Sequence, residues 1–187
     1  MLEGIVTTLN VDGSVNIAPM GPIVDESLDH MLLRPFATST TYQNLKRTGV
    51  GVFHVTDDVE LLAQAAINRV SPMPSVASAE GVEGAILADA CRWYAFRVES
   101  IDDSAERVAV AARAVQRGVN REFFGFNRAK HAVVEAAILA TRLHLVKRGD
   151  VLAEFDRLAL LVQKTGAAAE HRALALLRRY VEQSASD

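Results

Sequence analysis

The sequence is poor in cysteine and in long apolar runs, and each shortage excludes a class of protein. Its 187 residues include one cysteine, Cys91, so no disulfide can form within the chain, as is usual in the reducing cytoplasm. No apolar run approaches the roughly 20 residues that span a membrane. The first six residues lack the basic and apolar regions of a signal peptide. We therefore expect a cytoplasmic protein without membrane segments.

Several kinds of active site are also missing from the sequence. The five histidines have no spacing typical of metal ligands, and no G-x-S-x-G nucleophile elbow, P-loop or G-x-G-x-x-G loop occurs. A net charge of −3 and a pI near 6.0 do not favour non-specific nucleic-acid binding. We expect no metal site and no nucleic-acid partner, and the sequence assigns no catalytic residue. Cys91 lies in an expected strand, so we interpret it as a buried packing residue.

Charge and periodicity both change near residue 125. Residues 1–126 carry a net charge of −6 and residues 127–187 a net charge of +3. The first part alternates with the period of strands, and the second follows the period of helices. We therefore predict an α+β, mainly β protein with a β domain over 1–125 and a helical domain over 126–187. Three helices are expected in the second domain: Asn127 to about Lys147, Asp150–Lys164 and Ala167–Gln183.

A β-hairpin is predicted at the start of the chain. The β-branched segment Gly4–Asn10 precedes Asp12-Gly13, a strong hairpin turn, and Val15–Met20 returns. Pro19 has no N–H to donate, so we expect strand pairing to fail there and to leave backbone groups free for a ligand. An ordinary edge-strand ending is the alternative. The other expected strands are His30–Arg34, Val50–Thr56, Ala90–Ile101 and Arg107–Arg117, with a helix at Val59–Asn68.

The stretch from Arg34 to Gly49 has the pattern of an anion site. Pro35 ends a strand, four hydroxyl residues follow at positions 38–41, and a short helix is expected over Tyr42–Arg47, stopped by Gly49. A helix start offers unpaired N–H groups and the positive end of its dipole. Hydroxyls and an arginine beside those groups suit a phosphate. The alternative is that one hydroxyl merely caps the helix.

The first C-terminal helix carries one charged stripe on an otherwise apolar surface. At 3.6 residues per turn its members fall on one side of the helix, and they are Arg128, His131, Glu135 and Arg142. We predict that this stripe faces the barrel or a dimer partner, because the rest of the helix is apolar enough to be enclosed. A solvated face is the alternative.

The order of these elements resembles the FMN-binding split-barrel proteins, the flavin-reductase-like group. Within that group the chain is most similar to a family known as a domain of unknown function in methanogenic archaea and planctomycetes. The residues that carry the resemblance are Asn16-Ile17-Ala18-Pro19-Met20-Gly21, Arg34-Pro35-Phe36 with Ser39, Thr41 and Asn44, Asn127-Arg128-Ala129, Glu135-Ala136-Ala137-Ile138 and Thr141-Arg142. The implied fold is an FMN-binding split β-barrel followed by a three-helix C-terminal unit.

The resemblance also implies a cofactor, a partner and site residues. The cofactor is noncovalent FMN, held in a homodimer with the flavin near the subunit interface. Arg34 would pair with the phosphate, the loop hydroxyls and amides would cradle it, and the backbone of 16–20 would lie along the isoalloxazine edge. The implied cofactor-binding residues are Asn16, Ile17, Ala18, Pro19, Met20, Arg34, Ser39, Thr40, Thr41 and Asn44.

Two functions agree with this resemblance. The first is a cytosolic FMN-dependent oxidoreductase of unknown substrate, in which the flavin carries the redox chemistry. The second is a flavin-binding or small-ligand-binding module without turnover, such as a partner subunit linked to one-carbon metabolism. A split barrel that has lost its cofactor is a third possibility. No nicotinamide signature occurs, which leaves the electron donor open.

Overall fold

A computed structural model describes residues 1–184, which form two compact units. The β-unit comprises residues 1–56 and 73–123, and the helical unit comprises residues 57–72 and the chain from 124 onward. In chain order the elements are β1 (Gly4–Leu9), β2 (Val15–Met20), β3 (Ile23–Val24), β4 (His30–Leu33), α1 (Thr40–Thr48), β5 (Val50–Val55), α2 (Val59–Ala66), β6 (Val76–Ser78), β7 (Ala85–Leu87), β8 (Arg92–Asp102), β9 (Ala109–Val119), α3 (Arg128–Ala140), α4 (Arg148–Thr165) and α5 (Ala168–Gln183).

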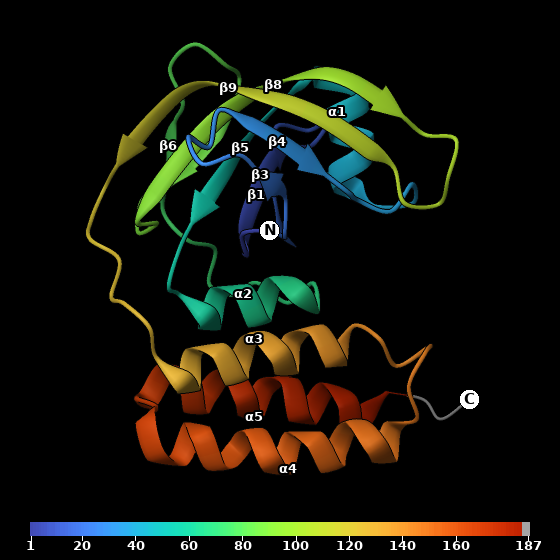
Figure 1. The fold of residues 1–187 in the computed structure, drawn as a ribbon, viewed down its shortest axis with the longest axis vertical. Helices are drawn as coiled ribbons and strands as arrows, with labels where there is room; N and C mark the ends of the chain where they lie inside the picture. The colour runs from blue at the N-terminus through green and yellow to red at the C-terminus, as the bar shows by residue number, and fades with distance from the viewer. Residues whose placement is uncertain (185–187) are drawn as a thin grey trace. The chain divides into compact units, whose positions relative to one another are not determined.

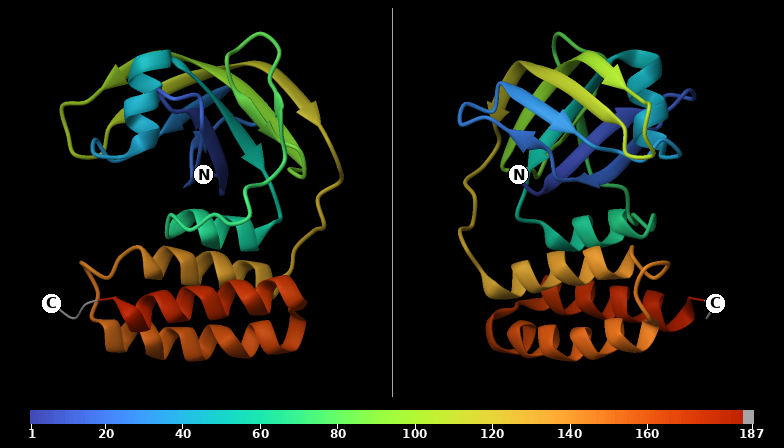
Figure 2. Two further views of the ribbon diagram at one scale, coloured as in Figure 1. Left: turned by 180° about the vertical axis from the view of Figure 1, so that it is seen from behind. Right: turned by 45° about the vertical axis from the view of Figure 1, so that its right-hand side comes forward.

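The β-unit is built on one antiparallel sheet of seven strands. Its order is β2-β1-β5-β8-β9-β4-β3, and the sheet curls into an open half-barrel (Figures 1 and 2). β6 and β7 form a separate antiparallel pair. β8 and β9 correspond to the predicted strands Ala90–Ile101 and Arg107–Arg117, and they pair as a long hairpin with register shifts after Ala95 and after Val98. This mixed α+β architecture agrees with the split barrel expected from the sequence.

The first hairpin forms as expected, but its pairing extends further than predicted. Gly13 takes a φ of +81° in the turn, which a glycine adopts without steric cost. Pro19 still lies opposite Ile5, and Met20 lies opposite Gly4. The expectation that pairing fails at Pro19 is therefore wrong. β2 is an edge strand, where a residue without an N–H can face away from its only neighbour.

Apolar side chains fill both faces of the sheet. The larger cluster lies inside the curl and includes Val6, Leu33, Leu45, Phe53 and Phe96, each fully buried. A smaller cluster on residues of β5, β7 and β8 lies beneath the segment that carries β6 and β7. Because α1 contributes its apolar face to the larger cluster, the start of α1 is fixed on the sheet.

The helical unit contains the three predicted helices and one more. α2 packs with α3 and α5, so four helices share this unit rather than three. Its enclosed residues include Val133, Phe155 and Leu177. Among the described residues, no helix is long and apolar enough to cross a membrane. The predicted limits of residues 1–125 and 126–187 stay a prediction for the domains.

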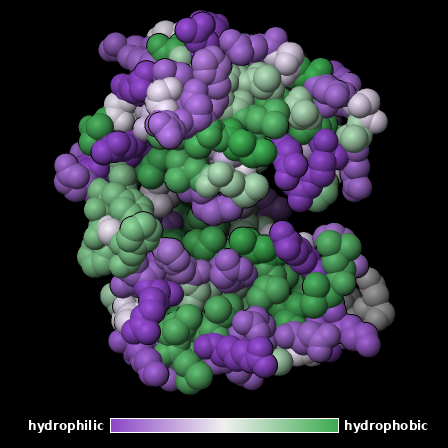
Figure 3. Space-filling model, viewed as in Figure 1, coloured by the Kyte–Doolittle hydropathy of each residue, from purple (hydrophilic) through white to green (hydrophobic). Residues whose placement is uncertain are grey.

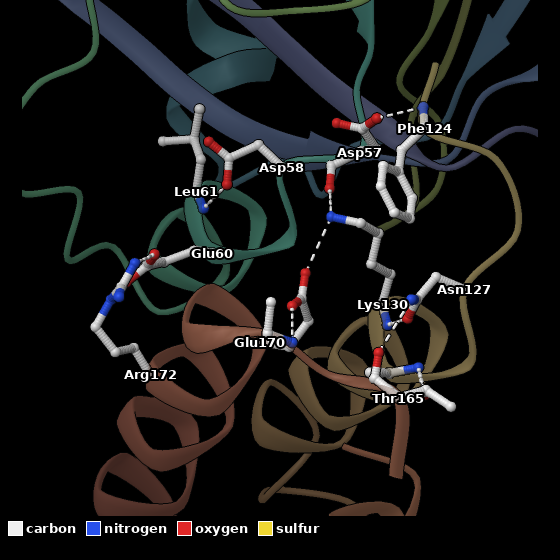
Figure 4. Close-up of polar contacts among 12 residues, drawn as sticks. Asp57, Asp58, Glu60, Leu61, Phe124, Asn127, Lys130, Thr165, Glu170 and Arg172 are labelled. Carbon is white, nitrogen blue, oxygen red and sulfur yellow. Dashed lines mark hydrogen bonds and ion pairs between the residues drawn. The ribbon is translucent and has the colours of Figure 1, made fainter. Parts of the chain in front are cut away.

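A polar cluster ties α2 to α3 and α5. Lys130 donates to the carbonyl of Asp57 at 2.7 Å and to Glu170 Oε1 at 3.0 Å, while Glu170 Oε2 accepts from the Ala167 N–H (Figure 4). The Phe124 N–H donates to Asp57 Oδ2 at 2.7 Å. These bonds hold together the two places at which the chain enters the helical unit, after β5 and after β9.

α3 ends seven residues earlier than the sequence predicts. It stops at Ala140, where the Thr141 hydroxyl donates to the Ile138 carbonyl, and turns follow instead of helix. Such a side-chain bond competes with the helical backbone and weakens its continuation. Arg142 therefore lies beyond the helix and does not share its surface with the rest of the charged stripe.

Candidate functional site

The candidate site is the hydroxyl loop, residues 34–41, which connects β4 to α1. Pro35 is buried, and the chain turns so that the Phe36 carbonyl accepts bonds from both the N–H and the hydroxyl of Ser39. Ser39 takes extended backbone angles and its Oγ accepts from the Tyr42 N–H at 3.2 Å. One hydroxyl thus serves as the N-cap of α1. This is the role that the alternative reading gave to a single hydroxyl.

Several donors at the loop have no acceptor among residues 1–184. The hydroxyls of Thr38 and Thr40 are exposed, and neither makes a hydrogen bond there. The first-turn N–H groups of Thr40 and Thr41 precede the first intrahelical bond of α1, and no acidic residue lies in that turn. The side chain of Arg34 is exposed and forms no ion pair with a described residue. Together these groups can bind a multiply charged anion.

The tip of the β8–β9 hairpin holds the loop from one side. The Val108 N–H donates to the Pro35 carbonyl, and Arg107 donates to the Arg34 carbonyl at 3.0 Å. The Arg107 guanidinium also lies 3.6 Å from the centre of the Phe36 ring. These contacts fix the backbone of the loop before a ligand arrives, which lowers the entropic cost of binding.

A second clamp joins the same hairpin tip to α1. The Tyr42 hydroxyl donates to Asp103 at 2.6 Å, and Lys46 approaches the same carboxylate at 2.8 Å. The bonds from Lys46 and Tyr42 lower the pKa of Asp103, and Asp103 in turn raises that of Lys46, so both groups stay charged. The Lys46 side chain is thus bonded to the hairpin tip and does not contribute a donor to the hydroxyl loop.

A polar network fixes the other side of α1 to β1 and β2. Asn16 donates to the hydroxyls of Thr8 and Thr41, each at 3.1 Å. Asn44 donates to Thr8 at 3.0 Å and to Asn10 at 2.8 Å. Thr41 and Asn44 are almost fully buried, so their side chains are used inside the protein. Their visible role is to position the helix start.

The bond between Asn16 and Thr41 brings the two predicted cofactor-binding segments together. It joins residues 16–20 on β2 to residues 34–44 at the hydroxyl loop and α1. Ile17 is buried, whereas Ala18, Pro19 and Met20 are half-buried. Since β2 is an edge strand, the backbone groups on its outer side have no partner strand. The candidate anion site and an open strand edge thus lie side by side.

Two parts of this arrangement have no signal in the sequence. Arg107 and the hairpin tip lie about 70 positions from the loop, and no local pattern connects them with it. Arg47 also contributes, because it donates to the Leu9 carbonyl and to Asn44. Neither contact has a periodic or spacing signal in the sequence, so only the tertiary structure identifies them.

The remaining polar candidates have structural roles or are exposed. His54 is buried and satisfied: Nδ1 lies 3.2 Å from the Ile5 carbonyl, and Nε2 accepts from the Leu87 N–H at 3.1 Å. Burial lowers the pKa of His54 to about 4 despite the bond to Ile5. Cys91 is buried, as expected of a packing residue. Within residues 1–184 no cluster of three metal-binding side chains occurs.

The charged stripe differs from its prediction. All four of its side chains are exposed, namely those of Arg128, His131, Glu135 and Arg142. The expectation that the chain itself encloses them is therefore wrong, and coverage by a second copy stays a prediction. The early end of α3 explains part of the difference, since it removes Arg142 from the helix.

Comparisons with known proteins give a family and a fold. The family model "Protein of unknown function (DUF447) N-terminal domain" matches residues 2–121, and the model "Protein of unknown function (DUF447)" matches residues 127–179. None of the curated proteins matches the sequence.

Solved structures with a similar fold include three flavin-related proteins. The FMN-bound protein MM1853 from Methanosarcina mazei is 23% identical, with a TM-score of 0.81, over 95% of this chain and 93% of that one. The styrene monooxygenase flavin reductase of Pseudomonas putida S12 is 14% identical, with a TM-score of 0.53, over 63% and 77%. Flavoredoxin of Desulfovibrio vulgaris (Miyazaki F) is 12% identical, with a TM-score of 0.55, over 63% and 69%. The split-barrel fold is therefore shared with these proteins.

Proposed function

The chain belongs to the DUF447 family, and on that premise we propose that it is a flavoprotein that binds FMN noncovalently at the hydroxyl loop. The observation that carries the proposal is a set of donors at this loop that have no acceptor in the described part of the chain: the hydroxyls of Thr38 and Thr40, two first-turn amides and the Arg34 guanidinium. An FMN-bound relative with the same fold supports the choice of ligand.

The residues at the loop fit a terminal phosphate. A phosphate dianion offers three oxygen acceptors and prefers charge-assisted bonds from a planar guanidinium. Arg34 would supply that fork, while Thr40 and Thr41 would supply amides at the positive end of the α1 dipole. Ser39 holds the helix start in place through its cap, and Asn44 does so through its bonds to Thr8 and Asn10.

The edge of β2 would hold the ring system of the cofactor. An isoalloxazine presents alternating donors and acceptors along one side, and an unpaired strand edge presents the complementary groups. The candidate segment is Asn16–Met20, which the Asn16–Thr41 bond sets beside the phosphate site. When bound, FMN supplies electron transfer, and the chain's own residues bind it, orient it and limit the access of water.

We further propose that the protein is a flavin-dependent oxidoreductase of unknown substrate. The likeness to a flavin reductase and to flavoredoxin supports this reading. The alternative, a flavin-binding module or partner subunit without turnover, is favoured by the site itself. Near the loop, the acid and the base with a shifted pKa are Asp103 and Lys46, and these two side chains form an ion pair with each other. Neither is therefore available to transfer a proton to a substrate. Bleaching of the bound flavin by NAD(P)H would support the first reading.

A homodimer is part of the proposal, as is a cytoplasmic location. β2 and β3 form the two edges of the sheet. Because the edge of β2 is assigned to the cofactor, a second copy would cover the edge at β3. Light scattering should then give about twice the chain mass of 20.3 kDa at micromolar concentration. A mass equal to that of one chain would contradict the dimer without affecting the cofactor assignment.

Substitution of Arg34 tests the phosphate assignment. We expect Arg34→Ala to weaken FMN binding by about 1.5–3 kcal/mol, the usual value of a bond to a charged group, measured by quenching of flavin fluorescence. Arg92→Ala is the matched control, because Arg92 is also exposed but lies at the opposite end of β8 from the hairpin tip. Equal affinities of the two variants would refute the role of Arg34, and a protein that never binds FMN would refute the whole proposal.

A further inference from the structure

The helical unit has a shallow hollow at the start of α3 that the flavin proposal does not use. Its volume is about 180 Å³, and its lining residues all belong to the helical unit: Phe126, Asn127, Arg128, His131 and Leu161. Two members of the predicted charged stripe, Arg128 and His131, therefore face one small cavity. The other two members, Glu135 and Arg142, do not line it.

The hollow contains a cation without a counter-charge. Arg128 is exposed and forms no ion pair or hydrogen bond with a described residue, and the first turn of α3 holds no acidic side chain. A cation at this position opposes the helix dipole, so its placement is unfavourable unless an anion accompanies it. The amides of Ala129 and Lys130 are already bonded to Thr165 and Asn127. Recognition of an anion would thus fall to the Arg128 side chain rather than to the helix backbone.

The rest of the hollow is suited to a flat, apolar group. Phe126 is 95% exposed, and its ring lies 6.1 Å from that of His131 at an angle of 71°. Leu161 of α4 adds an aliphatic wall. Figure 3 shows hydrophobic areas among the polar surface on one face of the helical unit. An aromatic ring with an open face gains energy from stacking against a planar partner.

The size of the hollow limits what it can hold. Its volume of about 180 Å³ is below the roughly 300 Å³ at which sites for drug-sized ligands begin. One ring with one carboxylate is a suitable guest. We propose that this hollow binds small planar organic anions, of the aromatic carboxylate class, with Arg128 pairing with the carboxylate and Phe126 and His131 packing on the ring. This site does not depend on FMN binding.

A titration of the full chain with benzoate tests the proposal. NMR spectra should show saturable shifts in the His131 ring and in the amides at the start of α3. Benzamide keeps the ring without the charge, and cyclohexanecarboxylate keeps the charge without the planar ring, so both should bind at least about tenfold more weakly. The titration is repeated with excess FMN present, which should leave the benzoate affinity unchanged if the two sites are separate.

Two arginine variants locate the binding. Arg128→Gln should weaken benzoate at least about tenfold through loss of the charge-assisted pair. Arg142→Gln is the matched control, because Arg142 is an exposed arginine that lies beyond the end of α3 and outside the hollow. This variant should bind benzoate as the unmodified chain does. No saturable shift at millimolar benzoate, or an equal response of both variants, would overturn the proposal. Equal affinities for benzoate and cyclohexanecarboxylate would overturn the preference for a planar ring.

Discussion

Substitution of Lys130 by Met should destabilise the helical unit through a charge left behind. The Lys130 and Glu170 side chains are only 19% and 5% exposed. Lys130 bonds to Glu170 and to the Asp57 carbonyl, at 3.0 and 2.7 Å. Methionine keeps the packing of the aliphatic stem but removes both bonds (Figure 4). The carboxylate of Glu170 then loses its cationic partner and keeps the bond from the N–H of Ala167.

The size of the loss follows from this geometry. Removing one partner of a buried ion pair costs about 3–5 kcal/mol, because the other charge remains in a poorly hydrated place. We expect a value near 3 kcal/mol in the free energy of unfolding, at the lower end, since some water reaches Lys130 and Glu170 keeps one bond. Adding Glu170→Gln should restore most of the loss, because no charge then remains unpaired.

The pH dependence of the loss separates this cause from simple packing. Burial by itself would raise the pKa of Glu170, but the bonds from Lys130 and from the Ala167 N–H hold it below its usual value. A lowered carboxyl pKa stabilises the fold above the pKa of the unfolded chain, and that contribution disappears as the pH falls through the folded pKa. The deficit of Lys130→Met should therefore shrink in acid.

The assay is urea unfolding followed by far-ultraviolet circular dichroism, which reports on the helices. Lys164→Met is the control, because Lys164 is exposed near the end of α4 and makes no bond to a described residue. It should change stability by no more than about 0.5 kcal/mol. If Lys130→Met costs no more than this control, or if the deficit is the same in acid, the buried-charge explanation is refuted.

Three further predictions concern other parts of the chain. Burial lowers the pKa of His54 from 6.5 to about 4, so between these two pH values the unfolded chain binds more protons than the folded chain. The free energy of unfolding should therefore fall by about 3 kcal/mol as the pH is lowered across this range. A His54→Gln variant with the same pH slope in urea unfolding would contradict this. Gly51→Ala should cost about 1–3 kcal/mol in the same assay, since its Cβ would lie 2.7 Å from Phe96 Cζ, and no loss would mean that the ring can move. Glu135→Ala should change the free energy of unfolding by less than about 0.5 kcal/mol, because Glu135 is exposed. A loss of several kcal/mol would indicate that the stripe is enclosed, for example in a dimer interface.

The sequence by itself determined the features that depend on neighbouring residues. The hairpin turn at Gly13, the Ser39 cap and the left-handed Gly49 at the end of α1 all appear where the pattern predicts them. Each is fixed within a few residues by turn chemistry or by bonds to the adjacent helix. The alternation of apolar residues in β8 predicted a strand, and the helical period after residue 127 predicted helices. Both patterns arise because the residues on the buried face recur at a regular spacing in the sequence. The order of strands and helices therefore followed from local patterns, whereas the split barrel itself was implied by the resemblance to a known family.

Only the tertiary structure decided which distant groups meet at the candidate site. The Asn16–Thr41 bond sets the edge of β2 beside the hydroxyl loop, and the β8–β9 hairpin brings Arg107 onto Phe36. These pairs are 25 and about 70 positions apart, so no spacing rule links them. Pairing continues through Pro19 because β2 lies at the sheet edge, which the sequence of β2 does not specify.

Tertiary structure also decided the composition of the helical unit and the exposure of the stripe. α2 lies between strands in the sequence, yet it packs on α3 and α5. The bond from Lys130 to the Asp57 carbonyl and the Arg172–Glu60 ion pair hold it there. α3 stops at Ala140, and the Arg142 N–H then bonds three residues back, to the Leu139 carbonyl, instead of continuing the helical ladder. An amphipathic pattern shows which face of a helix is apolar, but the partner that covers it depends on the packing of the whole chain.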